Sequence, residues 1–548
     1  MTDAIARVPT PHNEPVKDFA PGSSERRSLK TRLESLASDR IDIPMVIGGA
    51  EVTTGNIYET VMPHQTKHVL GDVHKGDAKH LSDAVAAAGK AHGEWANLAW
   101  EERAAVFLRA AELLAGPWRD TINAATMLGQ SKTVHQAEID AACELIDFWR
   151  FNVHFAERIY AEQPGAAPGM WNQLDYRPLE GFVFAVTPFN FTSIAANLPT
   201  APALMGNTVV WKPSLTQAFS AHFLMKLFEA AGLPDGVINM VHGAGPEIGE
   251  PALAHPDLAG IHFTGSTGTF EWMWRQVGEH VSDYRNFPRL VGETGGKDFI
   301  VAHASASVEA LSTALIRGAF EYQGQKCSAA SRVYVPSNLW DGLRERIADE
   351  VPKIAMGDVT DFSNFMGAVI DDRAFGRHKE ALDEARSSSD LEVVAGGTAE
   401  DSIGYFVEPT VVKTDDPKSR LMREELFGPV VTVFVYPENE YEAALELVDT
   451  STPYGLTGAI FAQDTYAIEQ AKTRLRWAAG NFYVNDKPTG AVVGQQPFGG
   501  ARRSGTNDKA GSMWNLVRWV SPRTIKETFS PPTDYHYPFM APETDDRR

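Results

Sequence analysis

The sequence contains two cysteines, and their surroundings differ. Cys327 lies in the run GQKCSAA (residues 324–330), where small residues leave room for a substrate and Lys326 adds a positive charge. A neighbouring cation favours the thiolate, the nucleophilic form of a side chain that is mostly protonated at neutral pH. This context predicts a catalytic nucleophile, with an inert buried thiol as the alternative. Cys143 lies in a predicted amphipathic helix without a basic neighbour, so there the inert thiol is favoured.

Two further polar side chains stand at the ends of predicted strands. Glu293 lies in VGETGGKD (residues 291–298), flanked by glycines, and burial there would raise its pKa and make it a general base. Asn190 lies in TPFNFT (residues 187–192), where its amide could donate to an oxyanion. The alternatives are a solvated glutamate in a surface turn and an asparagine that only caps a turn.

A glycine turn, TGSTGTF (residues 264–270), links a predicted strand to a predicted helix. A helix N-terminus in this position is suited to binding an anion such as phosphate. The spacing is GxxG rather than the GxGxxG dinucleotide fingerprint, so a tight turn without a ligand remains equally open. For the similar run GAGP (residues 243–246) the simple turn is favoured.

The elements that must position these residues alternate between short apolar strands and helices. Residues 80–160 are predicted to be helical, and two alternating series follow. Fully apolar strands that alternate with helices are typical of parallel sheets covered on both faces, so we expect two α/β units. The predicted strands are 182–186, 208–211, 237–241, 260–263 and 289–291 in the first series, and 331–335, 391–395, 430–436, 456–462 and 481–484 in the second.

Two segments are predicted to lie outside these units. QPGAAPG (residues 163–169) breaks the preceding helix, and residues 171–178 then resemble an exposed strand or hairpin arm. The proline-rich tail from residue 521 has no helical periodicity, which is compatible with an arm that reaches a partner subunit.

Composition excludes several classes of protein. The chain has 548 residues with 50 Lys+Arg against 71 Asp+Glu, and its net charge of −21 argues against nucleic-acid binding. Two cysteines cannot form a disulfide scaffold or a four-thiolate zinc site, and we expect no metal. Residues 1–40 are charged and lack the apolar core of a secretory signal, and the uncharged stretch 181–211 is interrupted by prolines and asparagines. We therefore expect a soluble, cytoplasmic protein without a membrane segment.

The order of the motifs along residues 40–525 resembles the aldehyde dehydrogenase superfamily. The resemblance is carried by Asn190, by Lys212 in WKPS, by Gly265 and Ser266, by Glu293, by Cys327, by Glu425 in EELFGP (residues 424–429), and by PFGG (residues 497–500). It implies an aldehyde dehydrogenase-like α/β fold with a Rossmann-type cofactor domain, an α/β catalytic domain and a β-arm for oligomerisation.

The resemblance also implies how the chain is divided. The cofactor domain would comprise residues 1–162 and 183–295, interrupted by an oligomerisation hairpin at residues 163–182. The catalytic domain would comprise residues 296–513, and residues 514–548 would form a C-terminal oligomerisation arm. A homodimer or higher homo-oligomer is therefore expected.

By motif position, the resemblance assigns catalytic and cofactor roles. Cys327 would be the nucleophile, Glu293 the general base, and Asn190 an oxyanion donor together with the backbone N–H of Cys327. NAD is the implied cofactor. Its contacts would be made by Lys212 and Glu425 at the riboses, by Phe427 near the nicotinamide, and by Thr187, Gly265 and Ser266 along the dinucleotide.

One position leaves the cofactor preference open. Many relatives that prefer NAD carry a glutamate three residues after the lysine that corresponds to Lys212, where it binds the adenine ribose. Leu215 stands there in this sequence, so neither an acceptor for a 2′-hydroxyl nor a partner for a 2′-phosphate is evident.

Three runs are similar to the family members that oxidise L-glutamate γ-semialdehyde, the open form of 1-pyrroline-5-carboxylate, to L-glutamate in proline catabolism. They are TPFNFT, GETGGKD (residues 292–298) and NDKPTGAVVGQQPFGGAR (residues 485–502). The likeness implies a substrate site in which Ser328, Gly490 and Ala491 bind the α-carboxylate, Glu144 binds the α-ammonium, and Phe191 and Phe498 enclose the aliphatic stem.

Alternatives to this interpretation remain. Glu144 could simply lie on a solvated helix face. The substrate could be another ω-semialdehyde acid such as succinate semialdehyde, or the fold could serve a structural role without catalysis. A phosphate-dependent glutamyl reductase is a related possibility, but such relatives lack a base of the Glu293 type.

Overall fold

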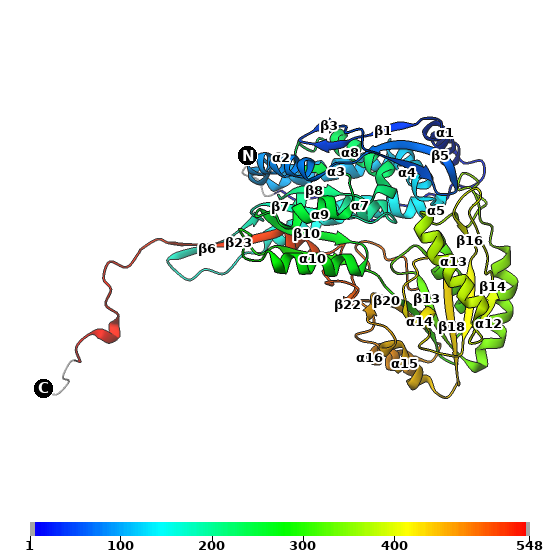
Figure 1. Ribbon diagram of the computed structural model, residues 1–548. Helices are drawn as coiled ribbons and strands as arrows, with labels where there is room; N and C mark the ends of the chain where they lie inside the picture. Colours follow the sequence, from blue (N-terminus) through cyan, green and yellow to red (C-terminus); the bar gives the residue numbers. More distant parts are fainter. Residues whose placement is uncertain (1–5, 544–548) are drawn as a thin grey trace.

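Two seven-stranded sheets organise the chain (Figure 1). The computed structural model describes residues 6–543; residues 1–5 and 544–548, which belong to the first and last predicted segments, lie outside the described residues. Strands predicted at residues 182–186, 430–436 and 481–484 are observed with those bounds. The predicted α/β class with largely parallel sheets is confirmed.

The first sheet reverses its strand order beside β7. The chain passes from β7 to β8 and β9, then crosses to the other side of β7 to form β10 and β11, all parallel. Ligands of such sheets bind outside the carboxyl ends of the strands at this switch point. In pairing order the strands are β11 (Arg289–Glu293), β10 (Leu258–Thr264), β7 (Phe182–Val186), β8 (Thr208–Lys212), β9 (Ile238–Met240), β2 (Met45–Ile47) and β3 (Ala50–Val52).

The second sheet is parallel except at one edge, where β14 pairs antiparallel with β17. Its β12 and β17 were not among the predicted strands. In pairing order the strands are β14 (Leu391–Ala395), β17 (Thr410–Thr414), β18 (Val430–Tyr436), β13 (Ala330–Pro336), β12 (Asp298–Ala302), β20 (Thr457–Phe461) and β21 (Asn481–Val484).

Only residues 294–297 separate the end of β11 from the start of β12. The carboxyl ends of the first sheet therefore face the amino ends of the second. Loops that carry functional side chains from both sheets meet at this junction.

Helices cover both sheets. They are α1 (Ser24–Ser38), α2 (Ala78–Asn97), α3 (Trp100–Ala115), α4 (Arg119–Gln130), α5 (Val134–Ala137), α6 (Leu145–Ala161), α7 (Thr192–Leu204), α8 (Ala218–Ala230), α9 (Gly245–Leu253), α10 (Thr267–Glu279), α11 (Val308–Phe320), α12 (Ser337–Glu350), α13 (Asp372–Ser387), α14 (Arg420–Arg423), α15 (Tyr441–Thr450), α16 (Thr465–Arg474) and α17 (Met513–Leu516). No helix within residues 6–543 combines the length and apolar character needed to cross a membrane.

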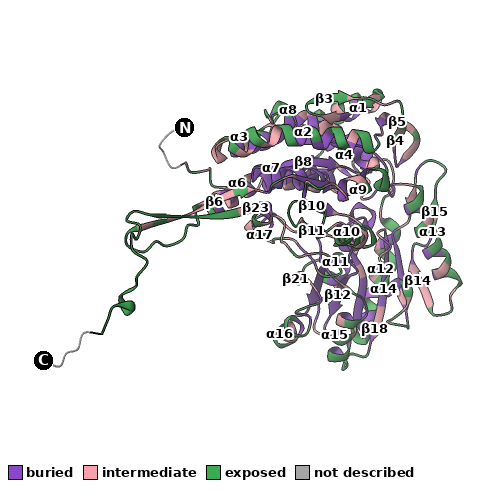
Figure 2. Cartoon of the chain, turned by 60° about the vertical axis from the view of Figure 1, so that its left-hand side comes forward, coloured by how far each residue is buried: buried purple, intermediate pink, exposed green. Residues whose placement is uncertain are grey.

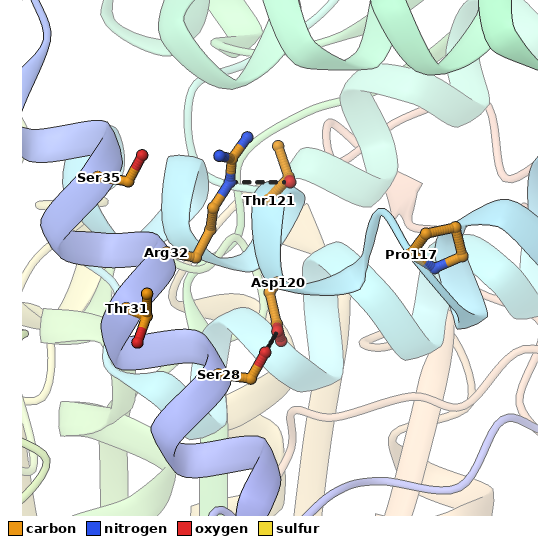
Figure 3. Close-up of a pocket in the computed structure, with 7 residues that line it drawn as sticks. All are labelled: Ser28, Thr31, Arg32, Ser35, Pro117, Asp120 and Thr121. Carbon is orange, nitrogen blue, oxygen red and sulfur yellow. Dashed lines mark hydrogen bonds between the residues drawn. The ribbon is translucent and has the colours of Figure 1, made fainter.

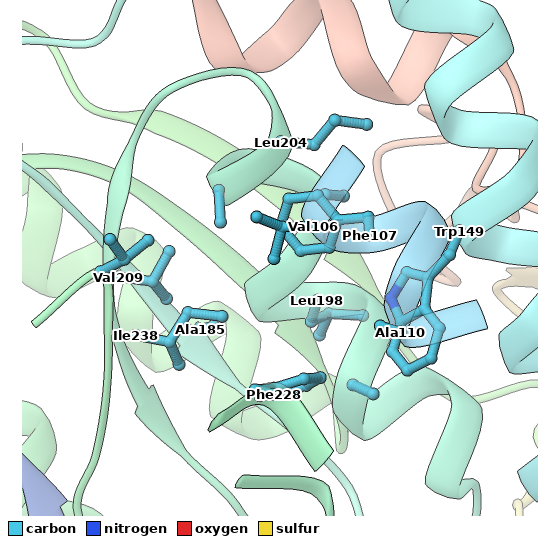
Figure 4. Close-up of a cluster of buried hydrophobic side chains, with 14 of the residues drawn as sticks. Val106, Phe107, Ala110, Trp149, Ala185, Leu198, Leu204, Val209, Phe228 and Ile238 are labelled. Carbon is cyan, nitrogen blue, oxygen red and sulfur yellow. The ribbon is translucent and has the colours of Figure 1, made fainter. Parts of the chain in front are cut away.

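The largest apolar core lies between the first sheet and helices α3, α6, α7 and α8. Figure 4 shows side chains of α3 and α6 packed toward strands β7, β8 and β9. Trp149 of α6 is 1% exposed in this core, and its indole N–H donates to Thr200 Oγ1 at 3.1 Å. The core fixes α6 and the segment before it against the sheet that carries the switch point.

The N-terminal region adds a small sheet and an irregular helix that the sequence did not predict. The sheet comprises β1 (Ile41–Ile43), β5 (Gln65–His74) and β4 (Ile57–Met62). Residues Glu138–Glu144 form a π-helix, η1, that runs directly into α6. π-Helical turns are rare and frequently occur at functional sites.

The segment predicted as a hairpin at residues 163–182 supplies only one strand. β6 (Met170–Pro178) pairs antiparallel with β23 (Val520–Thr528) from the C-terminal arm, in register from Met170↔Thr528 to Pro178↔Val520. Within the segment, residues 163–169 form no strand that could pair with β6. The resulting ribbon projects from the body (Figure 2). Its β23 is largely exposed and its β6 is mostly half-buried.

The core analysis gives a first testable prediction. Trp149→Ala should destabilise the fold by about 3–5 kcal/mol, because it removes a fully buried indole and leaves a cavity. The midpoint of urea unfolding, followed by far-ultraviolet circular dichroism, measures the change. Trp477→Ala is the matched control because Trp477 is 68% exposed. Equal shifts for the two variants would contradict the packing described.

Candidate active site

A cavity of about 390 Å³ lies at the junction of the two sheets. It collects Cys327 and Glu293 together with every residue predicted to bind substrate: Glu144, Phe191, Ser328, Gly490, Ala491 and Phe498. A separate hollow between α1 and α4, beside Arg32 and Asp120, contains none of the predicted site residues (Figure 3). The junction cavity is therefore the candidate active site.

Cys327 is presented by an unusual turn just before β13. Tyr322 and Gln323 have φ values of 52° and 55°, a left-handed conformation that is costly for side chains other than glycine. Buried hydrogen bonds hold the turn: Gln323 Nε2 donates to the carbonyls of Ser131 at 2.9 Å and Ala368 at 2.8 Å. These buried hydrogen bonds stabilise the turn and so fix the Cys327 thiol in the cavity wall.

The electrostatic surroundings keep the Cys327 thiol protonated. Burial, followed by the nearby acids Asp298, Glu293 and Glu425, raises the pKa of the thiol well above its ordinary value. The prediction that Lys326 favours the thiolate is wrong, because its ammonium pairs with Glu321 at 3.2 Å. Forming the thiolate therefore requires a proton acceptor inside the cavity.

Glu293 is suited to accept that proton. It ends β11, and its Oε2 accepts the backbone N–H of Gly500 at 3.1 Å. Burial raises the pKa of the Glu293 carboxyl well above its ordinary value, while the cation of Lys509 opposes the shift. A carboxylate with a raised pKa is an effective general base near neutral pH. Its partly buried position in the cavity wall contradicts the alternative of a solvated surface turn.

Asn190 is buried behind the turn that carries the thiol. Its Nδ2 donates to the carbonyl of Gln325 at 3.0 Å, two residues before Cys327. Asn190 is not one of the residues that line the cavity. An amide nitrogen carries two hydrogens, so one N–H is left for a further acceptor.

The residues predicted along the cofactor lie at the carboxyl ends of the first sheet. Thr187 follows β7, Lys212 ends β8, and Gly265 follows β10. Ser266 caps α10 by accepting the backbone N–H of Thr269 at 3.2 Å. The N-terminus of this helix, at the switch point, attracts phosphate through its free N–H groups and its dipole.

Lys212 supplies a cation without a partner. Burial lowers the pKa of its ammonium to about 8, and within residues 6–543 no side chain or carbonyl pairs with it. Leu215 begins the short helix η2 (Leu215–Gln217) and adds no charge there. A partly buried cation at the same edge of the sheet as a helix N-terminus fits the riboses and phosphates of a dinucleotide.

Glu425 and Phe427 reach the same region from the loop before β18. Glu425 Oε1 accepts the backbone N–H of Gly296 at 3.0 Å, and burial raises the pKa of its carboxyl to about 7. Phe427 has φ of 59°, and its ring contacts Phe189 edge-on with centroids 5.8 Å apart. The residues predicted for the cofactor thus come from both sheets.

Glu144 ends η1 and lines the cavity instead of occupying a solvated helix face. Ser193 Oγ donates to its Oε2 at 2.9 Å. Burial and the neighbouring Asp140 raise the pKa of the Glu144 carboxyl to about 8. A cationic ligand would therefore stabilise the ionised form of this carboxyl.

Ser328 and Phe191 are also held in place by neighbours. The hydroxyls of Ser328 and Thr489 lie 2.8 Å apart. The ammonium of Lys132 lies 4.1 Å from the centre of the Phe191 ring, within range of a cation–π interaction. Both contacts orient side chains that face the cavity.

The sequence analysis missed a buried ion pair that supports the site. Lys132 Nζ and Asp140 Oδ2 lie 2.6 Å apart and are almost fully buried. The Asp140 carboxylate also accepts the backbone N–H groups of Thr192 and Ser193, at 3.0 and 2.9 Å. It thereby caps α7 from another helix, because the N-cap residue Phe191 provides no side-chain cap.

Lys509 was missed as well. Its ammonium donates to the carbonyls of Gly480 at 2.8 Å and Gly499 at 3.1 Å. It therefore fixes the turn whose next residue, Gly500, donates to Glu293. The signal available in the sequence was a lysine nine residues after the glycine pair that ends the PFGG motif.

Cys143 has a basic neighbour after all, from a different helix. Arg119 Nη2 lies 3.4 Å from its Sγ, and the same guanidinium forms a buried ion pair with Glu138. Burial nevertheless raises the pKa of the Cys143 thiol to about 12, as expected for an unreactive thiol.

Comparison with known proteins agrees with this architecture. The sequence model described as the aldehyde dehydrogenase family matches residues 51–525, and the chain belongs to this family. The relatives described next belong to a narrower group within this family. The chain is 48% identical over 540 residues to "Delta-1-pyrroline-5-carboxylate dehydrogenase, mitochondrial" of Dictyostelium discoideum, which covers 98% of this chain and 97% of that protein.

Solved structures point the same way. The crystal structure of the Delta-pyrroline-5-carboxylate dehydrogenase from Mycobacterium tuberculosis bound with NAD has a TM-score of 0.95 and 58% identity, covering 98% of this chain and 100% of that one. The 1-pyrroline-5-carboxylate dehydrogenase from Thermus with bound NAD has a TM-score of 0.90 and 30% identity, covering 96% and 100%.

The environment of Glu293 gives a second prediction. Glu293→Gln should lower both the first turnover of NADH and the steady-state rate of aldehyde oxidation by about 10²–10⁴-fold, the usual contribution of a general base, because Glu293 accepts the thiol proton before it activates water. Stopped-flow absorbance measures the first turnover separately from the later ones. An unchanged first turnover followed by a slow steady state would restrict Glu293 to hydrolysis of the thioester.

The control for this variant is its pH profile. Hydrolysis needs ionised Glu293, whose pKa is raised, so the wild-type rate should fall as the pH decreases through a pKa well above 4.5. The glutamine variant should lack this dependence.

Proposed function

We propose that this chain is an NAD-dependent dehydrogenase that oxidises L-glutamate γ-semialdehyde to L-glutamate. The observation that carries the proposal is one cavity whose wall contains a thiol, a carboxylate base and the polar side chains of Glu144 and Ser328. The relatives named above support the same activity.

The cavity matches the substrate from end to end. The aldehyde lies at Cys327, and the α-carboxylate accepts hydrogen bonds from Ser328 and from the backbone N–H groups of Gly490 and Ala491. Gly490 has φ of 95°, a conformation that glycine adopts without strain. Glu144 binds the α-ammonium, which lowers the pKa of this partly buried carboxyl and leaves both groups charged.

The chemistry follows from the groups in the wall. Cys327 loses its proton to Glu293, and the thiolate adds to the aldehyde carbon to give a thiohemiacetal oxyanion. The free N–H of Asn190 and the backbone N–H of Cys327 stabilise this oxyanion. NAD, when bound, supplies the hydride acceptor. A thioester remains on Cys327. Glu293 releases the thiol proton to solvent and then takes a proton from water, which attacks the thioester and releases the acid and the thiol.

Aldehyde, NAD⁺ and water are thereby converted to acid, NADH and a proton.

The chain's contribution to binding the dinucleotide comes from Lys212 and Glu425 at the riboses, Phe427 at the nicotinamide, and Thr187, Gly265 and Ser266 along the phosphates. The partly buried ammonium of Lys212 and the helix N-terminus at Ser266 support this assignment. Leu215 leaves the extent of discrimination against NADP to measurement.

We also propose a homodimer or higher homo-oligomer assembled through the ribbon of β6 and β23. Both outer edges of this exposed two-stranded ribbon are unpaired within the described residues, and unpaired edges readily recruit another strand. The proposed division of the chain remains 1–162 and 183–295 for the cofactor domain, 296–513 for the catalytic domain, and 163–182 with 514–548 for the arm. Sedimentation of the full chain tests the assembly.

The proposed compartment is the cytoplasm. The relative from D. discoideum is named as mitochondrial, so the mitochondrion is the alternative compartment. Fractionation of the source cells tests this assignment.

The activity itself is tested with the nucleophile variant. Wild-type protein should reduce NAD⁺ in the presence of 1-pyrroline-5-carboxylate, and Cys327→Ser should lower turnover by at least about 10³-fold, since a hydroxyl is a far weaker nucleophile at neutral pH. NADH binding, followed by fluorescence, should stay within about twofold of wild type by the same reasoning, since the change affects covalent catalysis. Unchanged turnover in the variant would refute the mechanism.

Glu144 distinguishes the proposed substrate from succinate semialdehyde, which has no ammonium group. Glu144→Gln should raise KM for glutamate γ-semialdehyde by about 10- to 100-fold, the cost of removing a buried charge partner. KM for succinate semialdehyde should not rise. A wild-type kcat/KM that is higher for succinate semialdehyde would favour that alternative substrate.

A further inference from the structure

We propose that Asn13 is a positioning residue that sets the distance between the two polar anchors of the substrate site. This inference rests on the proposed function and deepens it. Asn13 lies in an N-terminal segment without regular structure, far along the chain from both anchors. Asn13, Glu14 and Val16 nevertheless form part of the wall of the active-site cavity.

The side chain of Asn13 uses all of its hydrogen-bonding groups to join two elements. Its Nδ2 donates to Asp147 Oδ2 of α6 and to the carbonyl of Val493, each at 2.8 Å. Its Oδ1 accepts from Gln495 Nε2 at 2.9 Å. The amide therefore bridges α6 and the loop at residues 489–496, here named the anchor loop.

Each end of this bridge lies close to a substrate anchor. Asp147 follows Glu144 by three residues, so the two carboxylates lie one above the other on the same side of the helical segment. Val493 follows Ala491 by two residues in the anchor loop. Asn13 thus connects the helix that binds the ammonium with the loop that binds the carboxylate.

The N-terminal segment is itself rigidly held. The backbone N–H of Glu14 donates to Asp147 Oδ1 at 2.7 Å, and its carboxylate pairs with Arg119 at 2.6 Å and Arg150 at 2.7 Å. Arg119 also donates to the carbonyl of Pro15 at 2.9 Å. These contacts hold Asn13 in a fixed position, and its side chain in turn positions the anchor loop.

Apart from its internal hydrogen bonds at residues 492–496 and the buried Val493 side chain, the anchor loop is held to the rest of the chain by a small set of contacts. It has no regular secondary structure, and Gly490 and Gly494 have φ values of 95° and 82°. Apart from Asn13, its attachments include the contact between Thr489 and Ser328 and the close approach of Gly494 to Phe151. Without the bridge, the N–H groups of Gly490 and Ala491 would lose their fixed distance from Glu144.

The consequence is selective. An aldehyde that carries both a carboxylate and an ammonium needs the two anchors at one distance, whereas a simple aldehyde such as propanal needs only Cys327, Glu293 and the oxyanion donors. Displacing a substrate-positioning group by about 1 Å can lower the rate about 10²-fold. Asn13 should therefore affect the amino acid semialdehyde and leave propanal unaffected.

The test compares both aldehydes in the full-length protein. Asn13→Ala should lower kcat/KM for glutamate γ-semialdehyde by about 10- to 100-fold, mainly through KM, and change kcat/KM for propanal by less than about twofold. Asn13→Asp, which keeps the size but places a second carboxylate against Asp147, should act in the same direction. Asn97→Ala is the matched control, because the Asn97 amide donates only to Gly93 of its own exposed helix.

Activity with propanal reports whether each variant is folded. Equal losses for the two aldehydes, or no loss for glutamate γ-semialdehyde, would overturn the role of Asn13. If the wild-type protein oxidises propanal but not glutamate γ-semialdehyde, the proposed function fails instead, so the two failures are distinguishable.

Discussion

The short connection between β11 and β12 determines how the two sheets, and with them the catalytic residues, lie relative to each other. Because residues 294–297 alone join the two sheets, the carboxyl ends of one sheet stand against the amino ends of the other. Glu293 is the last residue of β11. The backbone N–H of Gly296 donates to Glu425, and this hydrogen bond attaches the loop before β18 to the connection. A longer connection would separate the base from the thiol. The junction therefore fixes the catalytic groups before any loop is considered.

The acids at the junction have a clear electrostatic cost. Asp298 is buried near Cys327, Glu293 and Glu425 are partly buried there, and burial raises the pKa of each carboxyl. Lys297 lies among them, and burial lowers the pKa of its ammonium to about 7. Because burial disfavours the ionised forms of these carboxyls, protons remain available for transfer within the site. The same burial that opposes charge thus prepares both the base and the thiol to exchange protons.

Part of this architecture could be predicted from the sequence, and the rest depended on contacts in space. Continuous apolar runs identified β7 and β18, because strands buried on both faces leave that signature. β12 was missed because its apolar run starts immediately after the glycine turn that follows β11. Lys326 shows the limit for the site, since its neighbour in sequence is the thiol but its partner in space is Glu321. No local pattern could place Asn13 beside a loop near the other end of the chain.

The pairing of β6 with β23 has a consequence for how the chain matures. The two strands come from widely separated parts of the sequence, so β6 waits without a partner until residues 520–528 have left the ribosome. An unpaired strand in a nascent chain is open to pairing with the wrong neighbour. A messenger truncated before residue 520 would yield a polypeptide with both sheets complete but β6 permanently without its partner. Quality control should therefore distinguish the finished chain from its truncated forms by this ribbon, far from the chemistry.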